Sequence, residues 1–207
     1  MSVYDKIING SHELFTRFGV KSITMDDIAK HLSISKKTIY QYFKDKNDLV
    51  ISVSKMHLEQ EREEIQSIKD QTTNAIETLI EESLCMRKKM SDLNPSLIYD
   101  LQKYHPEAWN LYLESKEAVY IRSLDETLKS GMAEGYFRED INPGILAVLR
   151  VEQIEMALNN RAYPRQRFDF KDVLIQLFDH FLNGLVSEKG RKLLKKYQHA
   201  HVELNSK

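Results

Sequence analysis

The sequence is poor in the residues that most often form disulfide bridges, turns and phosphate-binding loops. In 207 residues it has one cysteine, Cys85, with 4 prolines and 7 glycines. One cysteine excludes a disulfide framework within the chain and a multi-cysteine zinc site. The glycines are isolated, so no glycine-rich loop can cradle a phosphate. Scarce proline and glycine, and the lack of valine- and threonine-rich alternating runs, predict an all-α fold.

Long hydrophobic runs are also missing. No apolar stretch approaches the length that spans a membrane, and the start, MSVYDKIING, lacks the apolar core of a signal peptide. We therefore expect a cytoplasmic protein with no membrane partner.

Enzyme motifs are weak. HELFTRF lacks the second histidine of a zinc-protease helix, and His199 and His201 are two residues apart, which puts them on different helix faces. The sequence predicts no enzyme activity, no cofactor and no metal site.

Charge is unevenly spread along the chain. The net charge is −1, but residues 1–46 hold eight Lys and Arg against five Asp and Glu, a local charge of +3. Four lysines lie between Lys36 and Lys46, opposed there only by Asp45. A basic end on a mildly acidic remainder indicates a local contact with a polyanion.

The basic region falls on three short helical patterns. Apolar residues from Ile7 to Phe18 predict a first helix that ends at Gly19. Thr24 has the position of an N-cap for a second helix over about 25–32. Ser35 then caps a third helix of about two turns.

That third helix is too short to be stable alone. Ile39 and Phe43, four residues apart, are expected to anchor it to its neighbours, which frees its other face. Two short helices joined by a tight turn, the second with an exposed basic and aromatic face, are typical of a helix-turn-helix that reads the DNA major groove. We predict a helix-turn-helix DNA-binding domain over 1–46 and a larger helical domain over 47–207, with about nine to ten helices.

In the larger domain, proline and N-cap residues indicate where several helices begin. A long helix begins near Asn47, and Pro106 opens a helix expected to continue towards Gly135. Asn142 and Pro143 form an N-cap and first-turn pair for a helix over about 143–160, and another covers about 170–185.

At this point the chain resembles the TetR family of transcriptional regulators. The stretch ITMDDIAKHLSISKKTIYQYFKDKNDLV, residues 23–50, is similar to the family's N-terminal signature, and SKKTIYQYFKDK is its most specific part. The resemblance implies a homodimer that binds double-stranded DNA at a palindromic operator, with a pocket for a small-molecule effector in each larger domain. The sequence does not identify that effector. A glycine is frequent in the family where Lys37 stands here.

The predicted DNA-binding residues lie on the second and third helices and at the start of the fourth. Lys36 and Lys37 suit guanine edges or phosphates, Gln41 suits an adenine edge, and Tyr40 suits a thymine methyl or a phosphate. The resemblance places Thr24, Tyr42 and Lys46 at positions that contact the DNA backbone. The full set is Thr24, Ser35, Lys36, Lys37, Thr38, Tyr40, Gln41, Tyr42 and Lys46.

The larger domain is predicted to dimerise through the helices over 143–160 and 170–185, and to bind a ligand. The helix over 143–160 is apolar on more than one face, which fits either an interface or a deeply buried core. Arg87 shares a helix face with Ile76, Ile80 and Leu84, so it meets either a ligand or water beyond an apolar stem. The ligand-binding candidates are Met86, Arg87, Met90, Tyr99, Trp109, Tyr112, Tyr120, Glu155, Met156 and Asn159.

The function predicted from all of this is a ligand-responsive repressor. Two alternatives stay open at this point. One is an activator, or a regulator controlled by a partner protein and not by a small molecule. The other is a helical enzyme that carries a DNA-binding domain.

Overall fold

The computed structural model describes residues 2–90, 93–94, 96–158 and 162–205, with only the backbone over 198–205. These residues confirm the all-α prediction: they contain no strand, only an isolated antiparallel bridge between Phe137 and Val186. The helices are α1 (Val3–Phe18), α2 (Met25–Leu32), α3 (Lys36–Tyr40), α4 (Lys46–Gln71), α5 (Ala75–Met90), α6 (Ser96–Tyr104), α7 (Pro106–Ser115), the π-helical segment η1 (Lys116–Ile121), α8 (Arg122–Ala133), α9 (Pro143–Leu158), α10 (Phe170–Leu185) and α11 (Glu188–Asn205).

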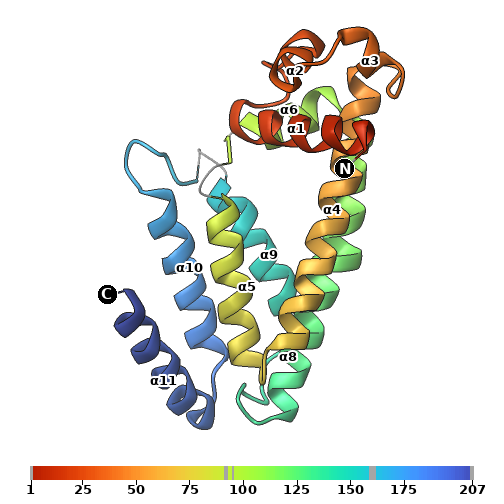
Figure 1. Cartoon of the computed structure of the whole chain (residues 1–207). Helices are drawn as coiled ribbons and strands as arrows, with labels where there is room; N and C mark the ends of the chain where they lie inside the picture. Colours follow the sequence, from red (N-terminus) through yellow and green to blue (C-terminus); the bar gives the residue numbers. More distant parts are fainter. Residues whose placement is uncertain (1, 91–92, 95, 159–161, 206–207) are drawn as a thin grey trace. The chain divides into compact units, whose positions relative to one another are not determined.

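The chain forms two compact units (Figure 1). The first unit consists of Met1–Glu64 and Lys89–Ser115, and the second unit of Ile65–Lys88 and Lys116–Lys207. The long helices α4 and α5 each contribute residues to both units.

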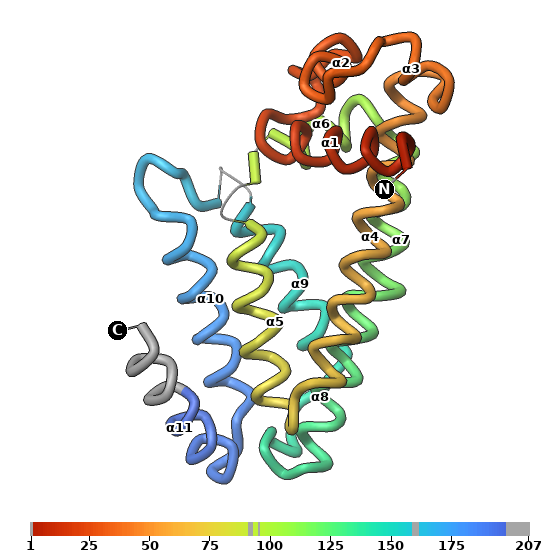
Figure 2. The backbone as a smooth tube through the Cα atoms, in the orientation of Figure 1, coloured from red at the N-terminus to blue at the C-terminus, as the bar shows by residue number. Residues whose placement is uncertain are grey.

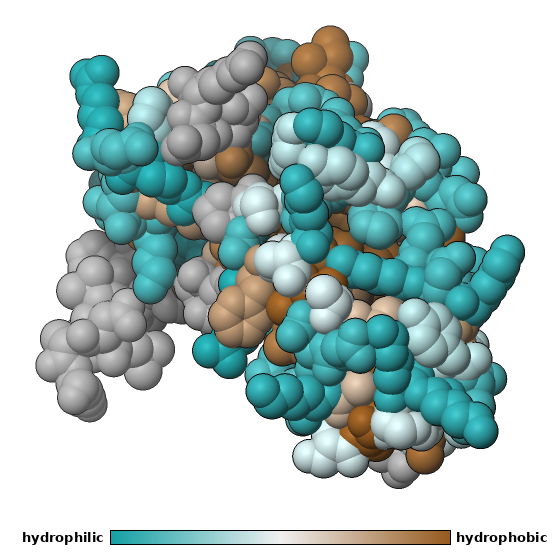
Figure 3. Space-filling model, turned by 90° about the horizontal axis from the view of Figure 1, so that it is seen from above, coloured by the Kyte–Doolittle hydropathy of each residue, from teal (hydrophilic) through white to brown (hydrophobic). Residues whose placement is uncertain are grey.

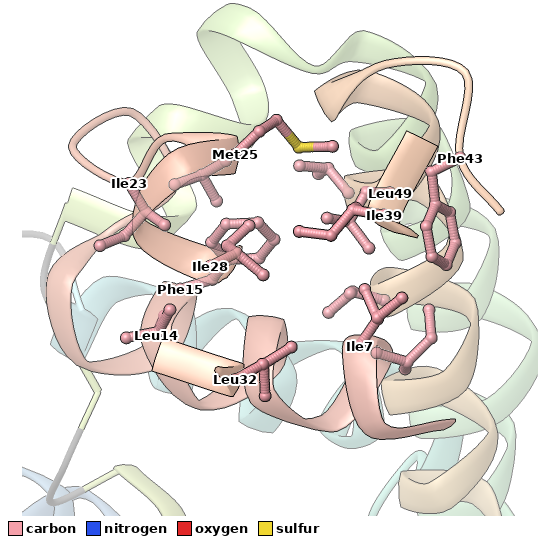
Figure 4. Close-up of a cluster of buried hydrophobic side chains, with 14 of the residues drawn as sticks. Ile7, Leu14, Phe15, Ile23, Met25, Ile28, Leu32, Ile39, Phe43 and Leu49 are labelled. Atoms are coloured by element: carbon pink, nitrogen blue, oxygen red, sulfur yellow. The ribbon is translucent and has the colours of Figure 1, made fainter. Parts of the chain in front are cut away.

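The first unit is built on a closed apolar core that α1, α2, α3 and α4 share. Figure 4 shows side chains from these helices pointing towards one another. Ile7, Ile28, Ile39 and Leu49 are each 0% exposed. A Cβ atom on Gly10 would lie 2.4 Å from Leu32 Cδ2, so this glycine allows α1 to approach α2 closely. The five-residue helix α3 is therefore stabilised by tertiary packing and not by its own length.

Helix ends in the first unit follow local rules. Gly19 ends α1 with φ of 80°, a conformation that a glycine adopts without strain. The loop after it is held from a distant part of the chain, because buried Asp100 of α6 accepts a hydrogen bond from the Lys21 backbone N–H at 2.9 Å. This hydrogen bond links the loop after α1 to α6, which lies 79 residues further along the chain.

The second unit has a core of its own, to which α5, α8, α9, α10 and α11 contribute. Figure 2 shows the backbone course of these helices. Leu128 is 0% exposed, and Leu174 and Leu185 are each 1% exposed. Ser187 Oγ accepts a hydrogen bond from the Gly190 N–H at 3.0 Å and so caps the start of α11. Asn142 Oδ1 likewise accepts from the Ile145 N–H at 3.1 Å at the start of α9.

Three predicted helix boundaries differ from the structure. The third helix ends at Tyr40, and Phe43 lies in the turn that follows, although its N–H still donates to the Ile39 carbonyl at 3.1 Å. The fourth helix begins at Lys46, one residue earlier than expected. The helix that Pro106 opens reaches Ala133, but it passes through the π-helical turn η1, which apolar periodicity alone does not reveal.

Candidate nucleic-acid interface

Two capped helices and a tight turn hold the predicted DNA-binding residues. Thr24 forms a capping box at the start of α2: its Oγ1 accepts from the Asp27 N–H at 3.2 Å, and Asp27 Oδ2 accepts from the Thr24 N–H at 2.8 Å. Ser33 ends α2 in the left-handed conformation, with φ of 53°. Ser35 then starts α3, where its Oγ accepts from the Thr38 N–H at 3.0 Å. Ser35 and Thr38 thus fix the geometry of the turn.

The short helix α3 separates a buried side from an exposed side. Ile39 is 0% exposed, whereas the adjacent Tyr40 is 46% exposed and Lys36, Lys37 and Gln41 are also exposed. The face of the molecule in Figure 3 is mostly hydrophilic, with small hydrophobic areas between polar side chains. An anchored helix with exposed lysine, tyrosine and glutamine side chains can enter a DNA groove without disturbing its own core.

Lys36 has an acidic partner that the sequence did not reveal. Its Nζ donates to Asp26 Oδ2 of α2 at 2.6 Å, and this hydrogen bond raises the pKa of Lys36. The ammonium therefore stays charged, but a DNA phosphate has to compete with Asp26 for it. Lys37 is exposed and has a freer approach to DNA.

Aromatic side chains pack against one another at the C-terminal end of the helix-turn-helix. Tyr42 is 45% exposed, and its ring meets Tyr4 of α1 edge-on with centroids 6.2 Å apart. Tyr4 also stacks on Phe43 at 5.3 Å. Its place at the start of α1, far from the motif in sequence, gave no signal of this role.

Lys46 is held differently from the other candidates. It is half-buried, and its Nζ donates to the Val20 backbone carbonyl at 2.6 Å. Burial lowers the pKa of Lys46, while Asp100 and Asp27 act in the opposite direction. This lysine therefore links the start of α4 to the loop after α1, in addition to any contact with DNA.

The predicted ligand-binding residues are divided between the two units. Met90, Tyr99, Trp109 and Tyr112 belong to the first unit. Tyr99 is 53% exposed and bonds with Lys103 at 2.7 Å, and the rings of Trp109 and Tyr112 lie 5.1 Å apart.

Met86, Arg87, Tyr120, Glu155 and Met156 belong to the second unit. Glu155 pairs with Lys116 at 2.8 Å, and Met156 is 40% exposed on α9. Asn159 lies outside the described residues.

Sequence reasoning missed the most unusual polar residue of the second unit. Arg150 of α9 is only 5% exposed and lies against the rings of Phe178 and Phe181, at 5.2 and 5.8 Å. Burial, and then the nearby charge of Arg87, lower the pKa of Arg150 to about 10. The available signal was one arginine inside the apolar stretch ILAVLRV, residues 145–151.

Other site types find little support in the part of the chain that the structure describes. Nowhere in it do three or more His, Cys, Asp or Glu side chains gather as candidate metal ligands. Among the described helices, none combines the length and apolar character needed to cross a bilayer.

The fold and the interface define a helix-turn-helix transcriptional regulator, and comparisons with known proteins agree. Residues 7–53 match the model of the bacterial regulatory proteins of the tetR family. An uncharacterised HTH-type transcriptional regulator of Bacillus subtilis, YvaF, is 24% identical over 172 residues, which cover 81% of this chain and 88% of that protein. The N-terminal part of the chain is therefore similar to the DNA-binding region of the tetR family, and the chain as a whole is similar to HTH-type transcriptional regulators.

Solved structures show the same fold. The regulatory protein TetR from Rhodobacter sphaeroides superposes with a TM-score of 0.74 at 19% identity, covering 88% of this chain and 98% of that one. A regulator from Saccharomonospora viridis, solved in complex with choline, has a TM-score of 0.73 at 17% identity and covers 89% of this chain and 97% of its own.

Proposed function

We propose that this protein is a ligand-responsive repressor that binds a palindromic DNA operator as a homodimer in the cytoplasm. The observation that carries the DNA-binding part is the division of α3 into a buried anchor, Ile39, and an exposed face. Residues 1–46 are the proposed DNA-binding domain, and residues 47–207 the proposed ligand-binding and dimerisation domain.

The roles of the side chains follow from their exposure. Lys37 and Gln41 have chemistry suited to base edges, and both are exposed. Thr24, Tyr42 and Lys46 are assigned to phosphates, together with the N-terminal end of α2. Such contacts position the protein on the duplex, whereas base contacts select the sequence.

Dimerisation is proposed through α9. One stripe of this helix exposes large apolar side chains: Ile145 is 66% exposed, Leu149 44%, Val148 43% and Met156 40%. An exposed apolar stripe on one helix face is the usual mark of a protein interface. A dimer with two DNA-binding domains fits two half-sites about 34–36 Å apart, or a multiple of that spacing.

Release by a ligand is proposed as a shift between two conformations of the dimer. A ligand that binds only the conformation with the wrong spacing of recognition helices lowers the population that fits the operator. The choline complex of the Saccharomonospora viridis regulator supports the idea that this fold can hold a small molecule.

The first experiment is a footprint of purified protein on the DNA upstream of its own gene, with excess non-specific competitor at physiological salt. We expect a protected palindrome. Lys37→Ala and Gln41→Ala should each weaken specific binding by about 1–3 kcal/mol, because each removes a contact to a base edge.

The matched control is Lys192→Ala, which removes an exposed lysine of α11 in the second unit. It should leave the footprint unchanged. Salt-sensitive binding elsewhere, without protection upstream of the gene, would move the operator to a distant site, and binding to no DNA would refute the proposal.

The dimer is tested by Ile145→Glu, which places a charge on the exposed apolar stripe of α9. Sedimentation at micromolar concentration should show a wild-type dimer and a monomeric variant. Leu113→Glu, at a residue 42% exposed on α7, is the control and should remain dimeric. A wild-type monomer at this concentration would contradict the proposal.

A further inference from the structure

The second unit contains a buried guanidinium, that of Arg150, for which the described part of the chain offers no ion-pair partner. Arg150 is 5% exposed, and its Nη1 has no hydrogen-bond partner among the described residues. Its side chain lies over Phe178 and Phe181, which satisfy the faces of the guanidinium and not its N–H groups. Those donors point outward in the guanidinium plane and require acceptors.

Two further buried polar side chains of the second unit also lack hydrogen-bond partners among the described residues. Gln153 lies three residues further along α9 and is 8% exposed, and Ser83 of α5 is 4% exposed. Among the described residues, neither Gln153 Oε1 nor Ser83 Oγ has a hydrogen-bond partner. Buried polar groups in native proteins are nearly always paired, so several orphans in one unit indicate a missing partner.

The charge balance around Arg150 suits one negative charge. Arg87 of α5 lies near enough to lower the pKa of Arg150, and Arg87 is itself attracted to Asp179 of α10. Arg87 Nε also donates to the Ser83 carbonyl at 3.2 Å. Asp179 therefore offsets Arg87, and within the described residues the positive charge of Arg150 has no counterpart.

The apolar side chains around Arg150 indicate the character of the uncharged part of the ligand. Phe178, Phe181 and Leu182 of α10 and Ile80 of α5 belong to the same buried apolar cluster. The rings of Phe178 and Phe181 that lie against Arg150 are part of this cluster, so a group bound at Arg150 beside them contacts apolar side chains.

We infer that the effector is a small monocarboxylic acid with an apolar body, and that its carboxylate binds Arg150 with Ser83 as a second donor. The inference rests on the proposed function, because it names the ligand class of the proposed regulator. A carboxylate accepts two parallel N–H bonds from one guanidinium, and its single charge matches the single unpaired charge. A phosphate monoester, with nearly two charges, would leave one of them buried without a partner.

The test uses sodium octanoate as the probe and octan-1-ol as its uncharged counterpart, on the full chain. At equal concentration, octanoate should raise the wild-type Tm by more than octanol does. Arg150→Met should reduce the octanoate shift to that of octanol, whereas Arg122→Met, at an exposed arginine of α8, should keep the wild-type shift. Without ligand, Arg150→Met should melt at or above the wild-type temperature, since an unpaired buried charge has been removed.

A second variant keeps the inference testable if Arg150→Met does not fold. Ser83→Ala removes one buried hydroxyl, and calorimetric titration should show octanoate binding weakened several-fold with little change in Tm. The inference is overturned if octanoate gives wild type no more stabilisation than octanol does, or if the octanoate shift survives in Arg150→Met. Unchanged octanoate affinity in Ser83→Ala would overturn the role assigned to Ser83.

A DNA-release assay separates this inference from the proposed function. If octanoate binds through Arg150 but leaves the operator complex intact, the carboxylate site stands and ligand-controlled repression fails. If an uncharged molecule releases wild type and Arg150→Met from the operator equally well, ligand-controlled repression stands and the carboxylate inference fails.

Discussion

The two units differ in how their buried polar groups are satisfied. In the first unit, buried Asp100 accepts a hydrogen bond from the Lys21 N–H, and the ring nitrogen Nδ1 of buried His105 lies 2.8 Å from Asn47 Oδ1. Six buried side-chain atoms lack a partner among the described residues, and five of these belong to the second unit: Glu82 Oε1, Ser83 Oγ, Ser123 Oγ, Arg150 Nη1 and Gln153 Oε1.

This difference fits the two proposed sites, one for DNA and one for a ligand. The proposed DNA-binding side chains need only be exposed on a fully packed unit, because DNA binds them from the solvent side. A ligand site inside a core has to keep polar groups unsatisfied until the ligand arrives. Natural proteins accept such local costs mainly at functional positions.

The largest change in stability should come from replacing the buried residue of α3, in contrast to its exposed neighbour. Ile39→Ala removes a fully buried side chain and should lower the free energy of unfolding by about 2–5 kcal/mol. Tyr40→Ala, at the exposed neighbour, should change stability by less than about 0.5 kcal/mol and still weaken DNA binding. Trp109, the only tryptophan, lies in the first unit, so its fluorescence reports that unit's unfolding. Equal stability losses in both variants would contradict the division.

The next effect concerns Glu82 in the second unit. Burial raises the pKa of Glu82 from 4.5 to about 7, against an opposing effect of Lys69. Between pH 4.5 and 7 the folded state therefore binds more protons than the unfolded state, and stability should fall as pH rises through this window. Glu82→Gln removes the buried charge and should stabilise the protein at pH 8 by about 3 kcal/mol at most.

The measurement is denaturant unfolding followed by circular dichroism at pH 5 and pH 8. At pH 5 the Gln variant and wild type should differ little. Glu81→Gln, at the exposed neighbouring glutamate, is the control and should show the wild-type pH dependence. An unchanged pH dependence in Glu82→Gln would mean that this carboxyl does not stay protonated in the fold.

The first unit should respond to pH in the opposite sense. Burial, then the His57 charge, lower the pKa of His12 from 6.5 to about 4, and Lys89 adds to this while Glu61 opposes it. The unfolded state binds more protons between pH 6.5 and 4, so stability should be lost as pH falls through that window. The loss should be about 2 kcal/mol, less than the full pKa difference implies because His12 is only partly buried.

His12→Phe keeps a ring beside His57 and should reduce this loss as measured by Trp109 fluorescence. Part of it should remain, because burial also lowers the pKa of His105. His180→Phe, at an exposed histidine of the second unit, should have no effect on the fluorescence transition. Acid stabilisation of the first unit would refute the assignment.

The smallest effect compares one helix cap in each unit. Thr24→Ala and Asp169→Ala each remove a side-chain acceptor at a helix start and should each cost about 1 kcal/mol. Only Thr24→Ala should also weaken binding to the operator, because only Thr24 belongs to the proposed DNA interface. Equal DNA affinity in the two variants would remove Thr24 from the phosphate contacts.

Local patterns in the sequence determined most of the helices and the position of the DNA-binding motif. Caps such as Ser187 and Asn142, and the first-turn Pro106, act within a few residues, so they are visible without a structure. The helix-turn-helix was predictable because its signals lie within about 30 residues. The early end of α3 was not predictable from the sequence. A helix this short depends on tertiary packing, so packing and not a local capping signal decides where it ends.

Tertiary structure alone decided which polar side chains are buried and what they meet. Lys46 bonds to the Val20 carbonyl, and Asp100 accepts from the Lys21 N–H, across 26 and 79 residues. In the sequence, Arg150 looks like an ordinary charged residue of α9. Only the structure shows that the rings of Phe178 and Phe181 of α10 lie against it. The physical reason is that burial depends on elements far apart in the chain, whereas capping and periodicity depend on neighbours.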